Sequence, residues 1–281
     1  MLPSCRETEL SQAIEDIMQR VFDMRKQINL KIKSSGKEIM IMEYPKLKKW
    51  IEESSHTVFF GGAGVSTESG IPDFRSENGT FKALEKYGRD PETLLSRSYF
   101  DMRPEVFFEY YRENLLVTDV QPNPAHLALA RLEEMGKLSA VITQNVDGLH
   151  QKAGSKHVLE LHGSMNRNYC MKCGKRYGVE KIQETTGIPR CECGGIIRPD
   201  VVLYEEGLPE DVFYEAENEI SKAELLIVGG TSLAVYPAAG LLQSFHGYYL
   251  VLINKSVTPF DFRADLVIRE PIGEVFASLG I

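Results

Sequence analysis

Short apolar runs alternate with longer segments of helical periodicity from Tyr44 to the C-terminus. The apolar runs, which we predict as strands, are 56–60, 139–143, 225–229, 248–253 and 266–268. The segments with apolar residues at three- and four-residue steps, which we predict as helices, are 46–53, 104–116, 124–135, 210–221, 236–246 and 272–279. Such alternation indicates an α/β fold, a parallel sheet with helices on both faces, in which ligands bind at the carboxyl ends of the strands.

One segment, 165–198, interrupts this alternation and contains four of the five cysteines. They form a Cys-x-x-Cys pair and, after seventeen residues, a Cys-x-Cys pair: Cys170, Cys173, Cys191 and Cys193. Two such turns can hold Zn²⁺ tetrahedrally, and four thiolates leave no open position, so we predict a structural zinc. The alternative is two buried cysteine pairs without a metal. Glycines follow the pairs where a zinc ribbon needs tight turns with positive φ: Gly174, Gly194 and Gly195. The fold is then a Rossmann-like sheet with a small inserted zinc-ribbon module, and Cys5 is an unremarkable thiol.

Charge and hydropathy exclude several classes of function. The 281 residues hold 32 Lys and Arg against 40 Asp and Glu, a net charge of −8, which disfavours electrostatically driven or sequence-specific binding of nucleic acid. No apolar stretch of about 18 residues is present, so we expect no membrane span. The first residues lack a basic and then apolar signal sequence. Clustered cysteines of this kind suit a reducing compartment, so we expect a cytoplasmic protein whose oligomeric state the sequence leaves open.

Residues 1–43 form an N-terminal extension to the predicted catalytic domain, 44–281. The extension holds seven basic and seven acidic residues, so the whole net charge lies in the remainder. Its apolar positions recur at three- and four-residue steps, which predicts an amphipathic helix. A second hypothesis is that the extension is a gene-model artefact and that synthesis begins at Met40 or Met42. The run Gly36-Lys37-Glu38 can be encoded by a purine-rich ribosome-binding sequence.

A glycine-rich turn, Gly61-Gly62-Ala63-Gly64, follows the first predicted strand. If a helix begins there, its free N–H groups face a phosphate, although glycine turns after strands also occur as plain connections. The dehydrogenase fingerprint is incomplete, because Thr67 stands where its third glycine belongs. The turn therefore suggests a dinucleotide site without hydride transfer.

Four further blocks carry polar groups to predicted strand ends or covering loops. They are Gly-Ile-Pro-Asp-Phe-Arg at 70–75, Thr-Gln-Asn-Val-Asp-Gly-Leu-His at 143–150, the pair His162-Gly163, and Gly-Gly-Thr-Ser-Leu at 229–233. Together with the cysteine ribbon and Arg-Pro-Asp-Val-Val at 198–202, these blocks resemble, in order and spacing, the sirtuin family of bacterial type. The resemblance extends from about Lys46 to the C-terminus and implies an NAD-dependent protein-lysine deacetylase.

The resemblance assigns roles residue by residue. It implies that His162 is the general base and that Asn145 and Asp147 belong to the catalytic site. NAD contacts are implied for Ala63, Gly64, Ser66, Asp73, Phe74, Arg75, Gln144, Asn145, Asp147, Gly230, Ser232 and Asn254. Acyl-lysine contacts are implied for Val201, Val202 and Tyr204. The other five histidines are expected to be structural or to lie on the surface.

In this family the acyl oxygen attacks the nicotinamide ribose, a histidine deprotonates a ribose hydroxyl, and the products are free lysine, nicotinamide and O-acyl-ADP-ribose. One alternative is an NAD hydrolase or mono-ADP-ribosyltransferase on the same fold. A second is a non-catalytic NAD sensor, which would have no need of a base. A nicotinamide dehydrogenase is disfavoured by the broken glycine fingerprint.

Two departures from the family pattern bear on substrate choice. Tyr204-Glu205-Glu206 stands where the family often has Phe-Gly-Glu, so Glu205 replaces a glycine and its carboxylate would suit a basic peptide. The Tyr-x-x-Arg pair of desuccinylating relatives is represented only by Tyr87-Gly88-Arg89, at the wrong spacing. A succinate carboxylate without a cationic partner is costly to bury, so we expect a preference for uncharged acyl groups. Residues 77–100 are expected to form a mobile loop that covers the cofactor.

Overall fold

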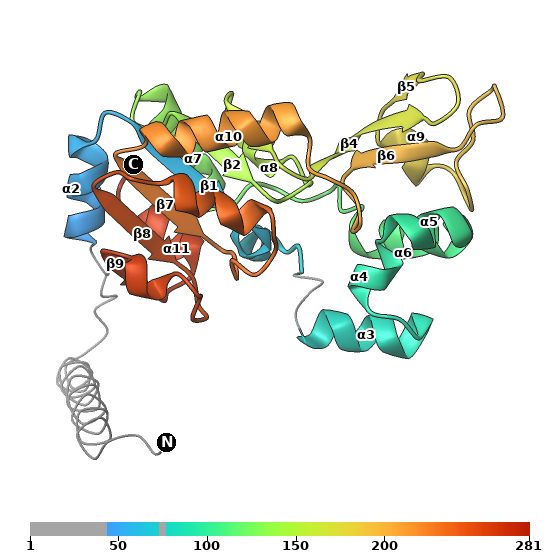
Figure 1. Cartoon of the computed structure of the whole chain (residues 1–281), viewed down its shortest axis with the longest axis horizontal. Helices are drawn as coiled ribbons and strands as arrows, with labels where there is room; N and C mark the ends of the chain where they lie inside the picture. The colour runs from blue at the N-terminus through green and yellow to red at the C-terminus, as the bar shows by residue number, and fades with distance from the viewer. Residues whose placement is uncertain (1–43, 73–76) are drawn as a thin grey trace, which may run out of the picture. The chain divides into compact units, whose positions relative to one another are not determined.

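The computed structural model describes residues 44–72 and 77–281, and its larger sheet is parallel and six-stranded (Figure 1). The strands lie in the order β3-β2-β1-β7-β8-β9. Their bounds are β1 Thr57–Gly61, β2 Ala140–Thr143, β3 Val158–Glu160, β7 Leu225–Gly229, β8 Tyr249–Ile253 and β9 Leu266–Ile268. The direction of winding reverses between β1 and β7, which is the place where doubly wound sheets bind ligands. The predicted parallel α/β sheet is confirmed.

The central strands are buried on both faces, as a parallel sheet requires. In β1, Phe59 packs into one hydrophobic cluster while Val58 and Phe60 pack into another, and all three side chains are fully buried. The Phe59 side is covered by α2 (Pro45–Glu53), α7 (Pro124–Glu134) and α11 (Ile272–Ser278). The other side is covered by α10 (Glu210–Lys222) and the 3₁₀ helix η3 (Ala238–Ser244). Burying each phenylalanine contributes about 2–3 kcal/mol.

A second, antiparallel sheet holds the cysteine segment. Its strands β4 (Gly163–Cys170), β5 (Arg176–Tyr177) and β6 (Ile197–Val201) lie in the order β5-β4-β6, and the short helix α9 (Glu180–Gln183) follows β5. Four of the five α-helices between β1 and β2 are α3 (Glu77–Tyr87), α4 (Pro91–Leu94), α5 (Arg97–Met102) and α6 (Pro104–Asn114). They share a third hydrophobic cluster with these strands, in which Phe107 and Tyr111 lie with Met165 and Ile197. The cysteine segment and helices α3–α6 therefore form one packed unit (Figure 1).

The remaining short elements lie in the connections that follow β1, β2 and β8. They are α8 (Leu149–Ala153) and the 3₁₀ turns η1 (Ala63–Val65), η2 (Thr67–Ser69) and η4 (Asp261–Arg263). Among the residues described, no helix is long and apolar enough to cross a membrane. The expectation for residues 1–43, a helix or a gene-model artefact, lies outside the described residues.

Three sequence predictions about local structure are wrong. Residues 77–100 form α3, α4 and the start of α5 rather than a loop, and their expected role as a cofactor cover stays a prediction. Capping explains the difference, because Asp90 accepts the N–H of Thr93 at 2.7 Å and Ser96 accepts that of Tyr99 at 3.2 Å. The helix at 104–116 does not cover the parallel sheet, because the aromatic residues of α6 pack in the third cluster.

The third error concerns the helices expected after two glycine turns. The glycine turn after β1 leads into the 3₁₀ turns η1 and η2, which end at Gly70 with a φ of 92°. The helix predicted for 236–246 is the 3₁₀ helix η3, with Gly240 inside it. Glycine lowers helix stability by about 1 kcal/mol relative to alanine, which fits the absence of a regular α-helix here.

Two buried histidines lie together, and one of them contacts Phe59 of β1, which agrees with the structural role expected for them. His126 on α7 and His150 on α8 have ring centroids 4.7 Å apart. Nδ1 of His126 accepts the backbone N–H of Asn123, whereas Nε2 of His126 and both ring nitrogens of His150 have no hydrogen-bond partner among the described residues. Burial lowers the pKa of His126 to about 4, and burial together with His126 lowers the pKa of His150 to about 3.

This histidine pair predicts a loss of stability in mild acid. The unfolded chain takes up protons near pH 6.5, whereas the folded pair stays neutral until about pH 4, so stability falls as the pH drops through this window. Each histidine contributes up to about 1.4 kcal/mol per pH unit. We expect Tm to fall less between pH 7 and pH 5 in His150→Leu than in the wild type. The exposed His246→Gln is the control, and equal pH dependence in His150→Leu would contradict the prediction.

Candidate active site

The glycine turns after β1 and β7 contact each other through their backbones. The N–H of Gly64 donates to the carbonyl of Gly230 at 2.8 Å, and that of Gly62 donates to Gly229 at 3.2 Å. A Cβ on Gly64 would lie 2.7 Å from Cα of Gly230, a distance that backbone atoms cannot accommodate. Glycine is therefore needed for close approach, and the carboxyl ends of the two strands are held together at the switch point of the sheet.

A chain of polar side chains lies directly beside this contact. Nδ2 of Asn145 donates to Oγ of Ser66 at 3.0 Å, and Ser66 Oγ donates to Oδ2 of Asp147 at 2.7 Å. The backbone N–H of Leu149 donates to the other carboxylate oxygen of Asp147 at 2.9 Å. Burial raises the pKa of Asp147, although these two hydrogen bonds to the carboxylate oppose the shift. The arrangement fixes the Asn145 and Asp147 side chains through one buried serine.

His162 lies between β3 and β4 and is oriented by the chain that follows β2. Its Nδ1 lies 2.8 Å from the carbonyl oxygen of Gln144, and the Nε2 of Gln144 donates to Oγ1 of Thr231 at 3.0 Å. A carbonyl oxygen only accepts, so the hydrogen is assigned to Nδ1 and the lone pair to Nε2. Gln144 thus links His162 to the loop after β7.

The predicted acyl-lysine segment follows β6 and runs beside His162. Val201 pairs with Gly163 across the antiparallel sheet, and the N–H of Val202 donates to the carbonyl of His162 at 2.9 Å. On its other side, the backbone of Tyr204 pairs with the 95–97 segment that leads into α5. The segment is therefore held between the second sheet and the helices.

A cavity of about 230 Å³ brings most of the predicted site residues together. Those that line it are Ala63, Ser66, Gln144, Asn145, Asp147, His162, Val201, Val202 and Tyr204. No lysine or arginine is present among the described residues of its lining, which include the acidic Glu205 and Glu206. The lining combines buried polar side chains with apolar ones, a combination typical of small-molecule sites.

Several predicted NAD residues lie elsewhere. Gly230 and Ser232 line a neighbouring cavity of about 500 Å³ that also contacts Tyr204. Gly64 belongs to the glycine contact, and Asn254 follows β8, where its Nδ2 donates to the carbonyl of Ser256 at 2.9 Å. Asp73, Phe74 and Arg75 lie outside the described residues.

The apolar wall of the cavity and one polar link, from Gln144 to Thr231, are not among the residues that the sequence motifs predict. Leu95, Leu115 and Leu208 contribute to the wall from three separate segments. No spacing or motif distinguishes these leucines from ordinary core residues. Thr231 was detectable, since it lies inside the Gly-Gly-Thr-Ser-Leu block and its hydroxyl accepts from Gln144.

Tyr87 and Arg89 do not reach this cavity. Both line a different cavity of about 780 Å³, which shares Tyr204 and Glu205 with the first, and the hydroxyl of Tyr87 donates to Glu113 at 2.6 Å. The pair that would recognise an acidic acyl group is therefore absent from the lining described.

The four cysteines form a cluster that fits a tetrahedral metal. The Sγ atoms of Cys170, Cys173, Cys191 and Cys193 all lie within 4.8 Å of one another. The Sγ separations are 3.4 Å for Cys170 and Cys193 and 3.7 Å for Cys173 and Cys191, near the roughly 3.8 Å spacing of a Zn–S₄ tetrahedron. Gly174 and Gly194 have positive φ as predicted, whereas Gly195 is required because a Cβ would lie 2.6 Å from Cys170 Sγ.

The sequence is similar to those of known proteins over most of the chain. The family model described as Sir2 family matches residues 62–237. A protein of Clostridium acetobutylicum named NAD-dependent protein deacetylase is 56% identical over 243 residues, covering 86% of this chain and 99% of the relative. A Staphylococcus aureus protein of the same name is 47% identical, covering 83% of this chain and 96% of the relative.

Solved structures described as Sir2 are similar to this chain in fold and in sequence. One, described as a Sir2 homolog–NAD complex, has a TM-score of 0.76 and 40% identity, covering 85% of this chain and 93% of the other. Another, described as Sir2 bound to acetylated peptide, has a TM-score of 0.73 and 39% identity, covering 84% and 96%. A third contains a deacetylated p53 peptide and 3′-O-acetyl-ADP-ribose, with a TM-score of 0.77 and 41% identity, covering 85% and 97%. With a family model matched across most of its length and relatives of this similarity, the chain belongs to the Sir2 family.

Proposed function

We propose that this protein is an NAD-dependent protein-lysine deacetylase that transfers the acetyl group of acetyl-lysine to ADP-ribose. The observation that carries the proposal is the placement of His162, Asn145 and Asp147 around one cavity that Val201 and Val202 also line. Bound NAD supplies an electrophilic ribose carbon, which accepts the acetyl oxygen as nicotinamide leaves. The protein's own residues supply orientation, exclusion of water and a base.

His162 is the base in this proposal. The carbonyl of Gln144 holds Nδ1 at 2.8 Å and fixes the tautomer in which Nε2 accepts a proton. A neutral imidazole is the group best suited to take a proton from a ribose hydroxyl at neutral pH. Gln144 therefore orients the base while Thr231 anchors Gln144.

Asn145, Ser66 and Asp147 form the polar end of the proposed nicotinamide and ribose site. Their hydrogen-bonded chain is preorganised, so little side-chain entropy is lost when a ligand binds. Phosphate contacts are proposed for the glycine turns, at groups other than the N–H groups of Gly62 and Gly64, which already donate to Gly229 and Gly230. NAD contacts are also proposed for a further set of residues: Asp73, Phe74, Arg75, Ser232 and Asn254.

The four cysteines are proposed to hold one structural zinc. The hydroxyl of Tyr177 donates to Sγ of Cys191 at 3.0 Å and the N–H of Lys172 donates to Cys170 at 3.4 Å, contacts that favour the thiolate form. Because Cys170 and Cys191 lie in the third hydrophobic cluster, the metal would also secure the helices that contact Tyr204. The chain from residue 44 onward is proposed as the catalytic domain, and reduced thiolates of this kind support a cytoplasmic location.

The first prediction concerns the base. We expect His162→Ala to lower production of O-acetyl-ADP-ribose from NAD and an acetyl-lysine peptide by about a hundredfold to ten-thousandfold. Mass spectrometry measures this product, with the exposed His246→Ala as the control. Unchanged production in His162→Ala would contradict the assignment. Nicotinamide release by the wild type without any acyl peptide would instead favour an NAD hydrolase, and binding of NAD without turnover would favour a sensor.

The second prediction concerns the acyl group. A succinyl carboxylate would enter a cavity lined by Glu205 and Glu206 and by no described lysine or arginine. An unpaired buried carboxylate costs several kcal/mol, so kcat/KM should be at least about a hundredfold higher for an acetyl peptide than for its succinyl counterpart. Peptides of one sequence carrying acetyl, propionyl or succinyl groups test this, and comparable acetyl and succinyl values would refute it.

The third prediction concerns the metal. We expect about one zinc per chain in the purified protein, measured by elemental mass spectrometry. Cys173→Ser should lose zinc and lower Tm by about 5 °C or more, because the metal joins two turns of the second sheet. Cys5→Ser is the matched control and should retain zinc and Tm. Full zinc content in Cys173→Ser would show that the cluster does not bind the metal as proposed.

A further inference from the structure

Glu205 adopts a backbone conformation that side chains rarely tolerate. Its φ is 76°, and the only other non-glycine residue with positive φ in the described part of the chain is Leu233. Both residues lie in segments that border the proposed acyl-lysine site, 201–208 and 230–237. Strained residues persist only where surrounding contacts hold them, so the contacts of Glu205 need a physical explanation.

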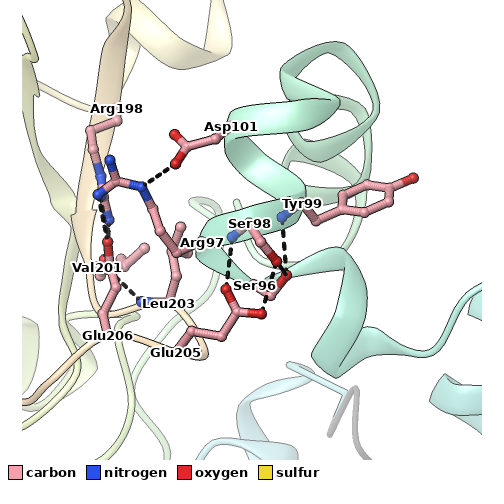
Figure 2. Close-up of polar contacts among 10 residues, drawn as sticks. All are labelled: Ser96, Arg97, Ser98, Tyr99, Asp101, Arg198, Val201, Leu203, Glu205 and Glu206. Carbon is pink, nitrogen blue, oxygen red and sulfur yellow. Dashed lines mark hydrogen bonds and ion pairs between the residues drawn. The ribbon is translucent and has the colours of Figure 1, made fainter.

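The carboxylate of Glu205 reaches the first turn of α5. It accepts the backbone N–H of Ser98 at 2.8 Å through Oε2 and the hydroxyl of Ser98 at 2.8 Å through Oε1. Figure 2 shows the Glu205 side chain extending from its own segment to Ser98 at the start of this helix. The negative charge satisfies a free N–H group at the helix N-terminus, where an anion is favoured.

The next residue, Glu206, holds the same segment through further contacts. Glu206 accepts from Arg198 at 2.8 Å and from Arg97 at 3.2 Å, and its Oε2 also accepts the N–H of Leu203 at 2.9 Å (Figure 2). Partial burial of Glu206 favours its neutral form, but these hydrogen bonds prevail and lower its pKa to about 2. Glu206 thus ties the segment to β6 and α5 through charge pairs.

Tyr204 lies immediately before this pair and contacts the same helix through its backbone. Its N–H donates to the carbonyl of Leu95 at 3.1 Å, and its carbonyl accepts the N–H of Arg97 at 3.0 Å. Glu205 therefore continues, through its side chain, a connection that Tyr204 makes through its main chain. The Ser98 contacts lie on the side of the segment that faces the helices, and the Val202 contact with His162 lies on the other.

We propose that Glu205 is a positioning residue for the acyl-lysine peptide, acting by fastening the 202–206 segment to the first turn of α5. The inference rests on the proposed function. A glycine would adopt the same φ without strain but could not make either contact with Ser98. Loss of the carboxylate should leave His162 and the NAD residues in place while the segment that receives the peptide becomes mobile.

The test separates peptide binding from chemistry. We would measure KM for an acetyl-lysine peptide, KM for NAD and kcat for the wild type, Glu205→Ala, Glu205→Gly and Glu205→Gln. Glu205→Ala and Glu205→Gly should raise the peptide KM about five- to tenfold, with kcat and the KM for NAD within about twofold. Glu205→Gln should stay within about twofold of the wild type, because an amide can accept from the Ser98 N–H and donate to its hydroxyl.

One control variant and one second readout accompany these measurements. Glu105→Gln removes an exposed carboxylate on α6 and should change no parameter. Amide hydrogen exchange of residues 96–102 and 202–206 should be faster in Glu205→Ala, a readout that does not depend on turnover.

An inactive wild type would refute the proposed function while leaving the exchange measurement to judge the positioning role. An active wild type with an unchanged peptide KM in Glu205→Ala would overturn the inference, as would equal rises in the KM for NAD and for the peptide.

Discussion

The backbone contact between the glycine turns after β1 and β7 is the constraint on which the rest of the site depends. Gly64 and Gly230 approach so closely that neither can carry a side chain, and the bond between them holds together the carboxyl ends of two strands. At that edge the 144–147 segment forms hydrogen bonds on two sides. Asn145 and Asp147 bond to Ser66, and Gln144 bonds to Thr231. Widening this contact would separate Gln144 from Thr231, because that pair joins the segment after β2 to the turn after β7.

The second constraint is the hydrophobic cluster shared by the cysteine sheet and helices α3–α6. Cys170 and Cys191 belong to this cluster, and Cys193 packs against it. The same cluster contains Val201 and Leu203 of the proposed peptide segment. A metal at the cysteines would therefore act on the substrate side of the protein through packing and not through coordination of the substrate. Ion pairs of Glu206 with Arg198 and Arg97 also connect this peptide segment to β6 and α5.

Much of the fold followed from periodicity, and the errors have identifiable causes. The predicted strands at 225–229 and 266–268 coincide with β7 and β9, because strands buried on both faces appear as continuous apolar runs. The 77–100 segment was mistaken for a loop because Gly88 and its many charges outweighed the caps of Asp90 and Ser96. The destination of α6 could not be predicted, since an aromatic helix face shows that it is buried and not which partner buries it.

The sequence by itself determined the parallel sheet, the cysteine set and the motif residues, because these depend on local pattern, on ligand chemistry and on short spacings. The tertiary structure decided which of those residues share a cavity, since Ser66, Asp147, His162 and Val201 meet only when separate strand ends converge. It also placed the Glu205 carboxylate against Ser98, whereas the sequence indicated only a carboxylate that would suit a basic peptide. Its contacts with Ser98 join residues 107 positions apart, and no local pattern specifies a partner at that separation.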